Sequence, residues 1–382
     1  MSFLKNTAKK AVGFLFRCLS FKRSILFEST PDFSDNTYPV FLALQQMGVG
    51  EKYHLVWSCA KEQPLPNAPK GIRYIYPQSS SKWQKLRNAY YRANAKCMIC
   101  CNRHLYPWGK GQMTIYLSHG TPLKNSREYY SLSAEIDYCL AASEGVADML
   151  AYQLSFPRER VIPLGFPRND VLTQPQQPVK QMLETDCRKV IVWYPTFRQH
   201  KNGMVSGSDK ALPVIHDAAA AQELNEWARE QDVLLVLKPH FAQDLTKIKA
   251  LNLSNIRFIG DAFFPDHNTT SYAFVAGCDA LITDYSSIYY DYLLCDKPIG
   301  LIWEDLEEYR SNPGFAVDIE EIAKSSVVIY TLADFKEFIR QIARGEDNNR
   351  EERNAMCRQV NYSRDGKNAQ RVADFIIEKA KL

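Results

Sequence analysis

The chain has 382 residues, which is too long for one ordinary hydrophobic core and suits two domains of roughly 150–200 residues each. Hydrophobic residues make up 46% of it and charged residues 24%, proportions that are typical of a globular protein. The formal charge of +4 is mild for this length, and no long Lys/Arg tract accompanies it. The composition therefore gives no reason to expect a nucleic-acid partner.

The first 24 residues carry basic and apolar residues without an acid. The basic residues are Lys5, Lys9, Lys10, Arg17, Lys22 and Arg23. The apolar run at 11–16 is too short for a secretory core or a membrane span. A basic amphipathic helix of this kind lies in the plane of an anionic membrane surface, which predicts peripheral membrane association. The alternative is a helix that packs on its own domain with a solvated basic face.

The ten cysteines form no regular framework. Cys97, Cys100 and Cys101 lie in an apolar run that is typical of a buried strand. No second cysteine pair or histidine follows at zinc-binding spacing, so we expect no metal site there. We expect reduced, buried cysteines in a reducing, cytoplasmic setting.

Short apolar runs typical of strands alternate with helical patterns along the rest of the chain. The expected strands lie within 24–29, 53–58, 72–77, 95–101, 113–120, 138–143, 160–167, 189–198, 233–240, 256–260, 280–287 and 297–303. The expected helices are 38–47, 82–93, 218–231, 271–277 and 287–295. Apolar runs with long crossovers fit parallel strands that are covered on both faces. Two such blocks predict two doubly wound α/β domains.

A segment rich in Pro and Gln, at 173–181, is the natural domain boundary. The predicted organisation is an amphipathic helix at 1–24, a first domain at 25–172, a linker at 173–186, a second domain at 187–345 and a helical tail at 346–382. The tail either caps the second domain or crosses back to the first, and the sequence does not decide between them.

Polar residues follow the expected strands at their carboxyl ends, where paired α/β domains bind ligands in the cleft between them. In the first domain, His119 is followed by Gly120, which permits close backbone approach, and by Thr121, which offers a hydroxyl. A neutral imidazole here can take a proton from an attacking hydroxyl, unless it merely caps a turn. Arg168 presents a charged donor fork suited to phosphate, unless it pairs with Asp170 to fix its turn.

The second domain offers candidates for contact with a donor phosphate. They are Thr196, Arg198, Lys238, His240, Thr283, Asp284, Ser286 and Ser287. His240 can orient a pyrophosphate or stabilise charge on a departing phosphate, unless it is satisfied within its loop. The block 279–299 is the most specific, because an apolar strand ends in two serines and a helical pattern starts at once. The free N–H groups of a helix N-terminus suit an anion. Asp305 either reaches a ribose or the acceptor, or has a surface role.

Several familiar phosphate-binding motifs are absent from the sequence. There is no Gly-x-x-x-x-Gly-Lys loop, no Gly-x-Gly-x-x-Gly fingerprint and no Asp-x-Asp pair after a strand. We therefore expect side-chain cations, hydroxyls and helix N-termini to neutralise the phosphates. No cofactor or fixed metal is expected, and assistance by Mg²⁺ stays open.

The segments 118–124, 165–170, 194–198, 238–240 and 281–292, in this order, resemble the CDP-glycerol glycerophosphotransferase family of teichoic-acid synthesis, and 25–41 resembles its opening segment. The resemblance implies a GT-B architecture of two Rossmann-like domains. His119 then matches the proposed catalytic base, His240 the second essential histidine, and Ser286 and Ser287 the donor-phosphate contacts. The first domain would bind the acceptor and the second the CDP-linked donor.

By the same resemblance, the chain is expected to be a peripheral enzyme on the cytoplasmic face of a bacterial cell membrane. It would transfer glycerol phosphate, or ribitol phosphate, from the CDP conjugate to a polyprenyl-diphosphate-linked saccharide, and release CMP. The product would belong to a teichoic-acid or capsule-like polymer, and the choice between primase and polymerase stays open. Two alternatives remain, namely a GT-B glycosyltransferase that uses a nucleotide sugar and an inactive membrane-associated scaffold.

Overall fold

The computed structural model describes residue 16 and residues 22–62, 69, 71–175, 178–196, 212–239, 248 and 250–382. The chain forms two compact units. Unit 1 comprises Met1–Thr121, Ser131–Asp170 and Asp365–Leu382, and unit 2 comprises Pro122–Tyr130 and Val171–Arg364. The predicted amphipathic helix at 1–24 lies almost wholly outside the described residues. Among the described helices, none is long and apolar enough to cross a membrane.

Unit 1 is built on a parallel sheet of seven described strands in the order β3-β2-β1-β4-β5-β6-β7. The strands are β1 (Ser24–Glu28), β2 (His54–Ser58), β3 (Arg73–Ile75), β4 (Ala95–Cys100), β5 (Met113–Tyr116), β6 (Tyr138–Ala141) and β7 (Val161–Pro163). The central strand β1 is buried along its whole length. Burial on both faces explains why it reads as a continuous apolar run instead of an alternating one.

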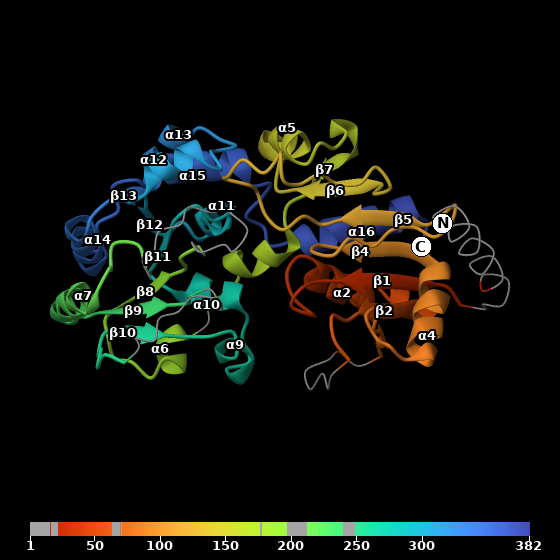
Figure 1. The fold of residues 1–382 in the computed structure, drawn as a ribbon, viewed down its shortest axis with the longest axis horizontal. Coiled ribbons are helices and arrows are strands. Elements are labelled where there is room, and N and C mark those ends of the chain that lie inside the picture. The colour runs from red at the N-terminus through yellow and green to blue at the C-terminus, as the bar shows by residue number, and fades with distance from the viewer. Residues whose placement is uncertain are drawn as a thin grey trace. The chain divides into compact units, whose positions relative to one another are not determined.

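The helices of unit 1 cover both faces of this sheet (Figure 1). They are α2 (Thr37–Gln46), α3 (Val49–Lys52), α4 (Lys82–Ala93), α5 (Glu144–Gln153), η1 (Arg158–Arg160) and α16 (Asn368–Ala380), and η2 (Pro167–Thr173) runs from this unit into the next. In β1, Phe27 packs edge-on against Phe41 of α2, whereas the Ser24 hydroxyl donates to the Tyr91 carbonyl of α4. Residues three apart on a strand point to opposite faces, so α2 and α4 lie on opposite sides of the sheet.

Unit 2 contains a parallel sheet of six described strands in the order β10-β9-β8-β11-β12-β13. The strands are β8 (Lys189–Trp193), β9 (Val233–Leu237), β10 (Ile256–Phe258), β11 (Ala280–Thr283), β12 (Ile299–Ile302) and β13 (Val327–Ile329). The described helices are α6 (Val179–Met182), α7 (Ala218–Glu230), α9 (Phe263–Asp266), α10 (Ser271–Gly277), α11 (Ile288–Tyr292), η3 (Leu293–Cys295), α12 (Leu306–Ser311), α13 (Ile319–Lys324), α14 (Leu332–Arg344) and α15 (Arg350–Val360).

Helix α14 contributes to the core of unit 2, and specific capping residues define both of its ends. Thr331 and Asp334 form a capping box at its start, and Gly345 ends it in the left-handed conformation at φ 73°. Its apolar face then meets the sheet, where Phe335 packs edge-on against Trp193 at a centroid distance of 5.2 Å. Burying a phenylalanine of this kind contributes roughly 1.5–3 kcal/mol.

The predicted fold class is confirmed, and each expected strand is present. Strand β13, at 327–329, was not predicted. The expected helix at 287–295 is divided between α11 and the 3₁₀ turn η3. The described cysteines are all free thiols and most are buried, as predicted.

The units exchange segments in a way that the predicted boundaries do not include. Residues 122–130 were expected in the first domain, but they belong to unit 2, where Lys124 forms an antiparallel bridge with Phe315. The expected tail at 346–382 is divided, since α15 belongs to unit 2 whereas α16 packs on α2 in unit 1. The tail thus contributes one helix to each unit.

Candidate functional site

His119 stands at the carboxyl end of the unit 1 sheet, just after β5. The backbone on both sides of it is left-handed, with φ 59° at Ser118 and φ 127° at Gly120. A side chain at position 120 would be strained by this φ, so glycine is required there. The turn leaves the His119 side chain 66% exposed, as a reacting group must be. Thr121 is buried, so its hydroxyl does not present itself to solvent.

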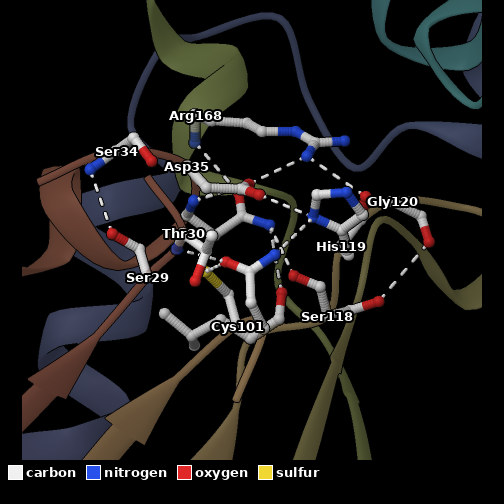
Figure 2. Close-up of polar contacts among 12 residues, drawn as sticks. Ser29, Thr30, Ser34, Asp35, Cys101, Ser118, His119, Gly120 and Arg168 are labelled. Carbon is white, nitrogen blue, oxygen red and sulfur yellow. Dashed lines mark hydrogen bonds and ion pairs between the residues drawn. The ribbon is translucent and has the colours of Figure 1, made fainter. Parts of the chain in front are cut away.

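A buried ion pair stands behind the imidazole (Figure 2). Asp35, in the loop between β1 and α2, places its Oδ2 2.7 Å from His119 Nδ1. Its other oxygen, Oδ1, accepts from Arg168 Nη1 at 2.8 Å. The side chains of Asp35 and Arg168 are each only 8% exposed, so water screens this pair weakly. Arg168 Nη1 also lies 3.2 Å from the His119 carbonyl oxygen.

Two asparagines connect the segments that carry these residues. The Asn36 amide donates to the carbonyls of Leu117 and Ser118 at 3.1 and 3.2 Å, and its oxygen accepts the N–H of Arg168 at 3.1 Å. The Nδ2 of Asn102 lies 3.1 Å from His119 Nδ1. Side-chain bonds to backbone therefore hold the β5 end and the start of η2 against one loop.

Glu28, the last residue of β1, anchors the loop that carries Asn102. It accepts the N–H groups of Asn102 and Arg103 at 3.1 and 2.9 Å, and it pairs with the Arg103 side chain at 3.1 Å. Burial raises the pKa of Glu28 above its ordinary value, although the Arg103 guanidinium and the two N–H donors oppose the shift.

Asp35 shows the opposite balance. Burial alone would raise the pKa of this carboxyl, but the charge of Arg168 and the hydrogen bond from His119 outweigh burial and hold the pKa well below its ordinary value. Asp35 is therefore a carboxylate at neutral pH, and the imidazole faces a fixed negative charge.

The structure thus brings together two predicted residues of unit 1, His119 and Arg168. Arg168 pairs with Asp35, a contact that neither alternative for this residue included. Asp170 accepts the N–H groups of Asn368 and Ala369 at the start of α16, at 2.8 Å each. Sequence reasoning missed Asp35 and Asn102, although both follow a strand at its carboxyl end, which is the signal that singled out His119.

At the strand ends of unit 2, the side chains of Thr283 and Asp284 form hydrogen bonds with backbone groups. The Thr283 hydroxyl donates to the Tyr194 carbonyl at 2.8 Å. The Asp284 carboxylate is buried and accepts the N–H of Thr196 at 3.0 and 3.1 Å and that of Tyr285 at 2.8 Å. These bonds join the ends of β8 and β11 through the Asp284 carboxylate.

Ser286 and Ser287 are half-buried at the start of α11. Ser287 is the N-cap residue but makes no capping bond with its side chain. Neither hydroxyl forms a hydrogen bond with any residue that the structure describes, so both remain available to a ligand.

The cations at this end of unit 2 differ in their environment. Lys238 pairs with Asp261 at 2.8 Å and lies 5.7 Å from the ring centre of Tyr194. Burial lowers the pKa of Lys124, while the Asp284 charge opposes that shift. The sequence prediction did not include Lys124, because it lies only five residues after His119 and reaches unit 2 through the exchanged segment.

The remaining predicted residues are Asp305, Arg198 and His240. Asp305 accepts the Tyr285 hydroxyl at 3.0 Å, and so helps to hold that buried ring. Arg198 and His240 lie outside the described residues. Within the described part of the chain, no group of three or more His, Cys, Asp or Glu side chains is placed to hold a metal ion.

Solved structures with a similar fold define the class of protein. A variant of the wall teichoic acid polymerase TagF, soaked with CDPG, matches with a TM-score of 0.73 and 20% identity over 99% of this chain and 96% of that one. A UDP-GlcNAc 2-epimerase from Neisseria meningitidis matches with a TM-score of 0.53 and 12% identity over 94% of this chain and 100% of that one. The chain is therefore an α/β protein of GT-B-like fold with two parallel sheets.

The family follows from sequence. The model of the CDP-Glycerol:Poly(glycerophosphate) glycerophosphotransferase family matches residues 13–378, so the chain belongs to that family, which makes it a transferase of teichoic-acid biosynthesis. The teichoic acid poly(glycerol phosphate) polymerase of Bacillus spizizenii is 27% identical over 79% of each chain. The Bacillus subtilis polymerase is 26% identical over 84% of this chain but only 44% of its own length. The teichoic acid glycerol-phosphate transferase of Staphylococcus aureus is 24% identical over 98% of this chain and all of its own.

Proposed function

We propose that this protein transfers glycerol phosphate, or a related polyol phosphate, from a CDP-linked donor to a membrane-linked cell-envelope acceptor and releases CMP. The observation that carries the proposal is the exposed His119 imidazole, held at a strand end by the buried Asp35–Arg168 pair. This is the arrangement of a general base, and it occurs in a chain of the glycerophosphotransferase family.

In the proposed reaction, an acceptor hydroxyl oxygen attacks the β-phosphorus of the donor. His119 takes the hydroxyl proton as the new oxygen–phosphorus bond forms. The bond between the β-phosphorus and the bridging oxygen breaks in line, and CMP leaves with the bonding electron pair. The protein need form no covalent bond, so positioning and neutralisation of phosphate charge supply most of the acceleration.

The donor diphosphate is assigned to unit 2, with the hydroxyls of Ser286 and Ser287 and the cation of Lys238 as its contacts. His240 and Arg198 belong to the same proposal through the sequence prediction alone. Replacing both serines with alanine should weaken binding of CDP-glycerol, measured by calorimetry in protein that also carries His119→Ala to prevent turnover. Ser254→Ala, at an exposed position of unit 2, is the matched control. Donor affinity that stays at the control value would remove the serines from the site.

The proposed acceptor is lipid-linked, and unit 1 has a surface suited to a membrane. Helix α4 contains Lys82, Lys85 and Arg87 at exposed positions and has no acidic residue. Its Trp83 is 79% exposed and Leu86 is 48% exposed. Exposed apolar side chains among cations favour an anionic lipid surface.

The test of the proposed function offers purified protein several activated donors with a lipid-linked disaccharide in detergent. The donors are CDP-glycerol, CDP-ribitol and a panel of nucleotide sugars. Acceptor-dependent release of CMP from a CDP-polyol is the expected result. Release of UDP or GDP from a sugar donor would instead make the protein a glycosyltransferase, the alternative that its fold also permits. No acceptor-dependent release from any donor by folded protein would favour the scaffold alternative.

A further inference from the structure

The neighbours of His119 Nδ1 determine where the ring hydrogen lies. Asp35 Oδ2 is 2.7 Å from this nitrogen, and an ionised carboxylate can only accept a hydrogen bond. Nδ1 must therefore carry the hydrogen and donate it. The Asn102 amide nitrogen, 3.1 Å away, is then a neighbour of Nδ1 and not a donor to it. In a neutral ring the lone pair is left on Nε2, which forms no hydrogen bond with any described residue.

The carboxylate that imposes this tautomer is itself fixed. Arg168 holds its second oxygen at 2.8 Å, and the Asn36 side chain ties the same loop to the β5 end and to the Arg168 backbone. The backbone at Asp35 is left-handed, at φ 54°, a conformation that L-residues rarely adopt. A strained loop braced at both ends places the carboxylate in one position relative to the imidazole.

We propose that Asp35 is the positioning residue of this site, fixing His119 as the Nδ1–H tautomer with Nε2 free to accept the acceptor proton, and that Arg168 acts through Asp35 rather than on the donor phosphate. The inference rests on the proposed function, because it supplies the partner of the base proposed there. It revises the sequence prediction for Arg168, since the guanidinium is buried and already engaged with a carboxylate.

The first test is made on the parent protein. Nuclear magnetic resonance of protein with isotopically labelled histidine reports which ring nitrogen carries hydrogen when the ring is neutral, and His119→Gln assigns the signal. The inference predicts hydrogen on Nδ1. Hydrogen on Nε2 would overturn it. This result does not depend on turnover, so it separates failure of the positioning from failure of the proposed substrate.

The second test compares Asp35→Asn with Asp32→Asn. Asp32 lies in the same loop and accepts the N–H of Ala60 at 3.2 Å, and no contact joins it to His119 in the described structure. Asp35→Asn should lower kcat by about 10²-fold or more, leave the donor KM within about twofold and shift the tautomer signal, as expected when a base loses its orienting carboxylate. Asp35→Glu should recover part of kcat. Unchanged kcat in folded Asp35→Asn would overturn the proposal.

Arg168→Met separates the two roles of the arginine. If Arg168 acts through Asp35, the substitution lowers kcat and leaves the dissociation constant of CDP-glycerol unchanged. Thermal unfolding checks that the variant is folded. Weaker donor binding with an unchanged tautomer signal would place Arg168 on the phosphate and overturn its assignment to Asp35.

Discussion

The exposed imidazole of His119 contacts the buried ion pair of Asp35 and Arg168. Its side chain is 66% exposed, whereas the Asp35 side chain behind it is only 8% exposed. A group that merely caps a turn does not need a shielded carboxylate on one ring nitrogen and solvent on the other. The arrangement favours proton transfer over a purely structural role.

Removing the base should cost turnover and not donor binding. His119→Ala is expected to lower transfer by about 10²–10⁴-fold, because proton removal from the acceptor is lost while the proposed donor contacts in unit 2 are untouched. Steady-state CMP release and donor calorimetry measure the two quantities. His267→Ala is the control, since His267 is exposed and stacks on Phe263 in unit 2. Transfer at the parent rate in His119→Ala would show that the base lies elsewhere.

Asp35 should also make stability depend on acid pH. Arg168 and His119 face this carboxyl and hold its pKa below the value of about 4 that it has when unfolded. Its contribution to folding is therefore complete only well above the unfolded pKa, at about pH 5 and higher, and is lost as the pH falls toward the folded pKa. The stability advantage of the parent over Asp35→Asn should shrink from about pH 5 to pH 3 in urea unfolding.

Asp32 is a control for that measurement, because its effect on stability should change with pH in the opposite direction. Burial raises the pKa of Asp32 above its ordinary value, although the Ala60 N–H opposes the shift. Folding therefore favours its protonated form, and the parent should gain stability relative to Asp32→Asn over the same fall in pH. If the stability difference between parent and variant changed with pH in the same way for Asp35→Asn and Asp32→Asn, the ion-pair account of Asp35 would be contradicted.

At the residue scale, the sequence predicted the ends of strands correctly but not the partners of the side chains there. His119 and Arg168 were singled out by residue type and position, and the structure joins them through Asp35. That carboxylate was not predictable as their partner, because 84 residues separate it from His119 and pairing across a sheet leaves no local pattern.

Among the elements, α16 depends on a segment far from it in sequence. Asp170 accepts the first N–H groups of this helix, the Asn368 amide donates to the Phe166 carbonyl at 3.1 Å, and the helix packs on α2. At Gly165 an added Cβ would collide with the Asn368 side chain, and φ there is +86°. The segment 165–170, which reads as a turn, therefore also forms the docking site of α16.

Removing the Asp170 carboxylate should loosen α16. Asp170→Ala is expected to cost about 1 kcal/mol of folding free energy, as for loss of an N-terminal cap, and to raise hydrogen exchange in α16. Asp374→Ala, at an exposed position of the same helix, is the control. Exchange in α16 that matches the control would show that packing on α2 alone holds the helix.

Some elements were predicted from the sequence close to their observed bounds. Strands such as β9 and the helix α7 were identified close to their observed bounds. The edge strand β13 was not predicted, although strands of the same length such as β3 and β10 were, so its length alone does not explain the miss. The division between α11 and η3 was not predicted because one helical pattern runs through both. The exchanged segments depend on tertiary pairing, such as the bond from Ala316 N to the Leu123 carbonyl at 2.8 Å.

For the whole molecule, association with a membrane can be tested through α4. Replacing Trp83 and Leu86 with alanine should reduce sedimentation of the protein with vesicles rich in phosphatidylglycerol, because exposed apolar area is lost. Tyr152→Ala, which removes a 60% exposed aromatic from α5 of the same unit, should leave it unchanged. Equal binding by all three proteins would show that α4 does not contact the lipid.

The most direct test of the central claim follows the two halves of the donor at once. CDP-glycerol labelled separately in the glycerol carbon and the β-phosphorus is incubated with the protein and a lipid-linked disaccharide. Attack of the acceptor on the β-phosphorus predicts that both labels enter the lipid product in equal amounts and that unlabelled CMP is left. Glycerol label in the product with the β-phosphorus left in CDP would contradict phosphoryl transfer. It would mean that the carbon–oxygen bond breaks, and His119 would then have no such attack to assist.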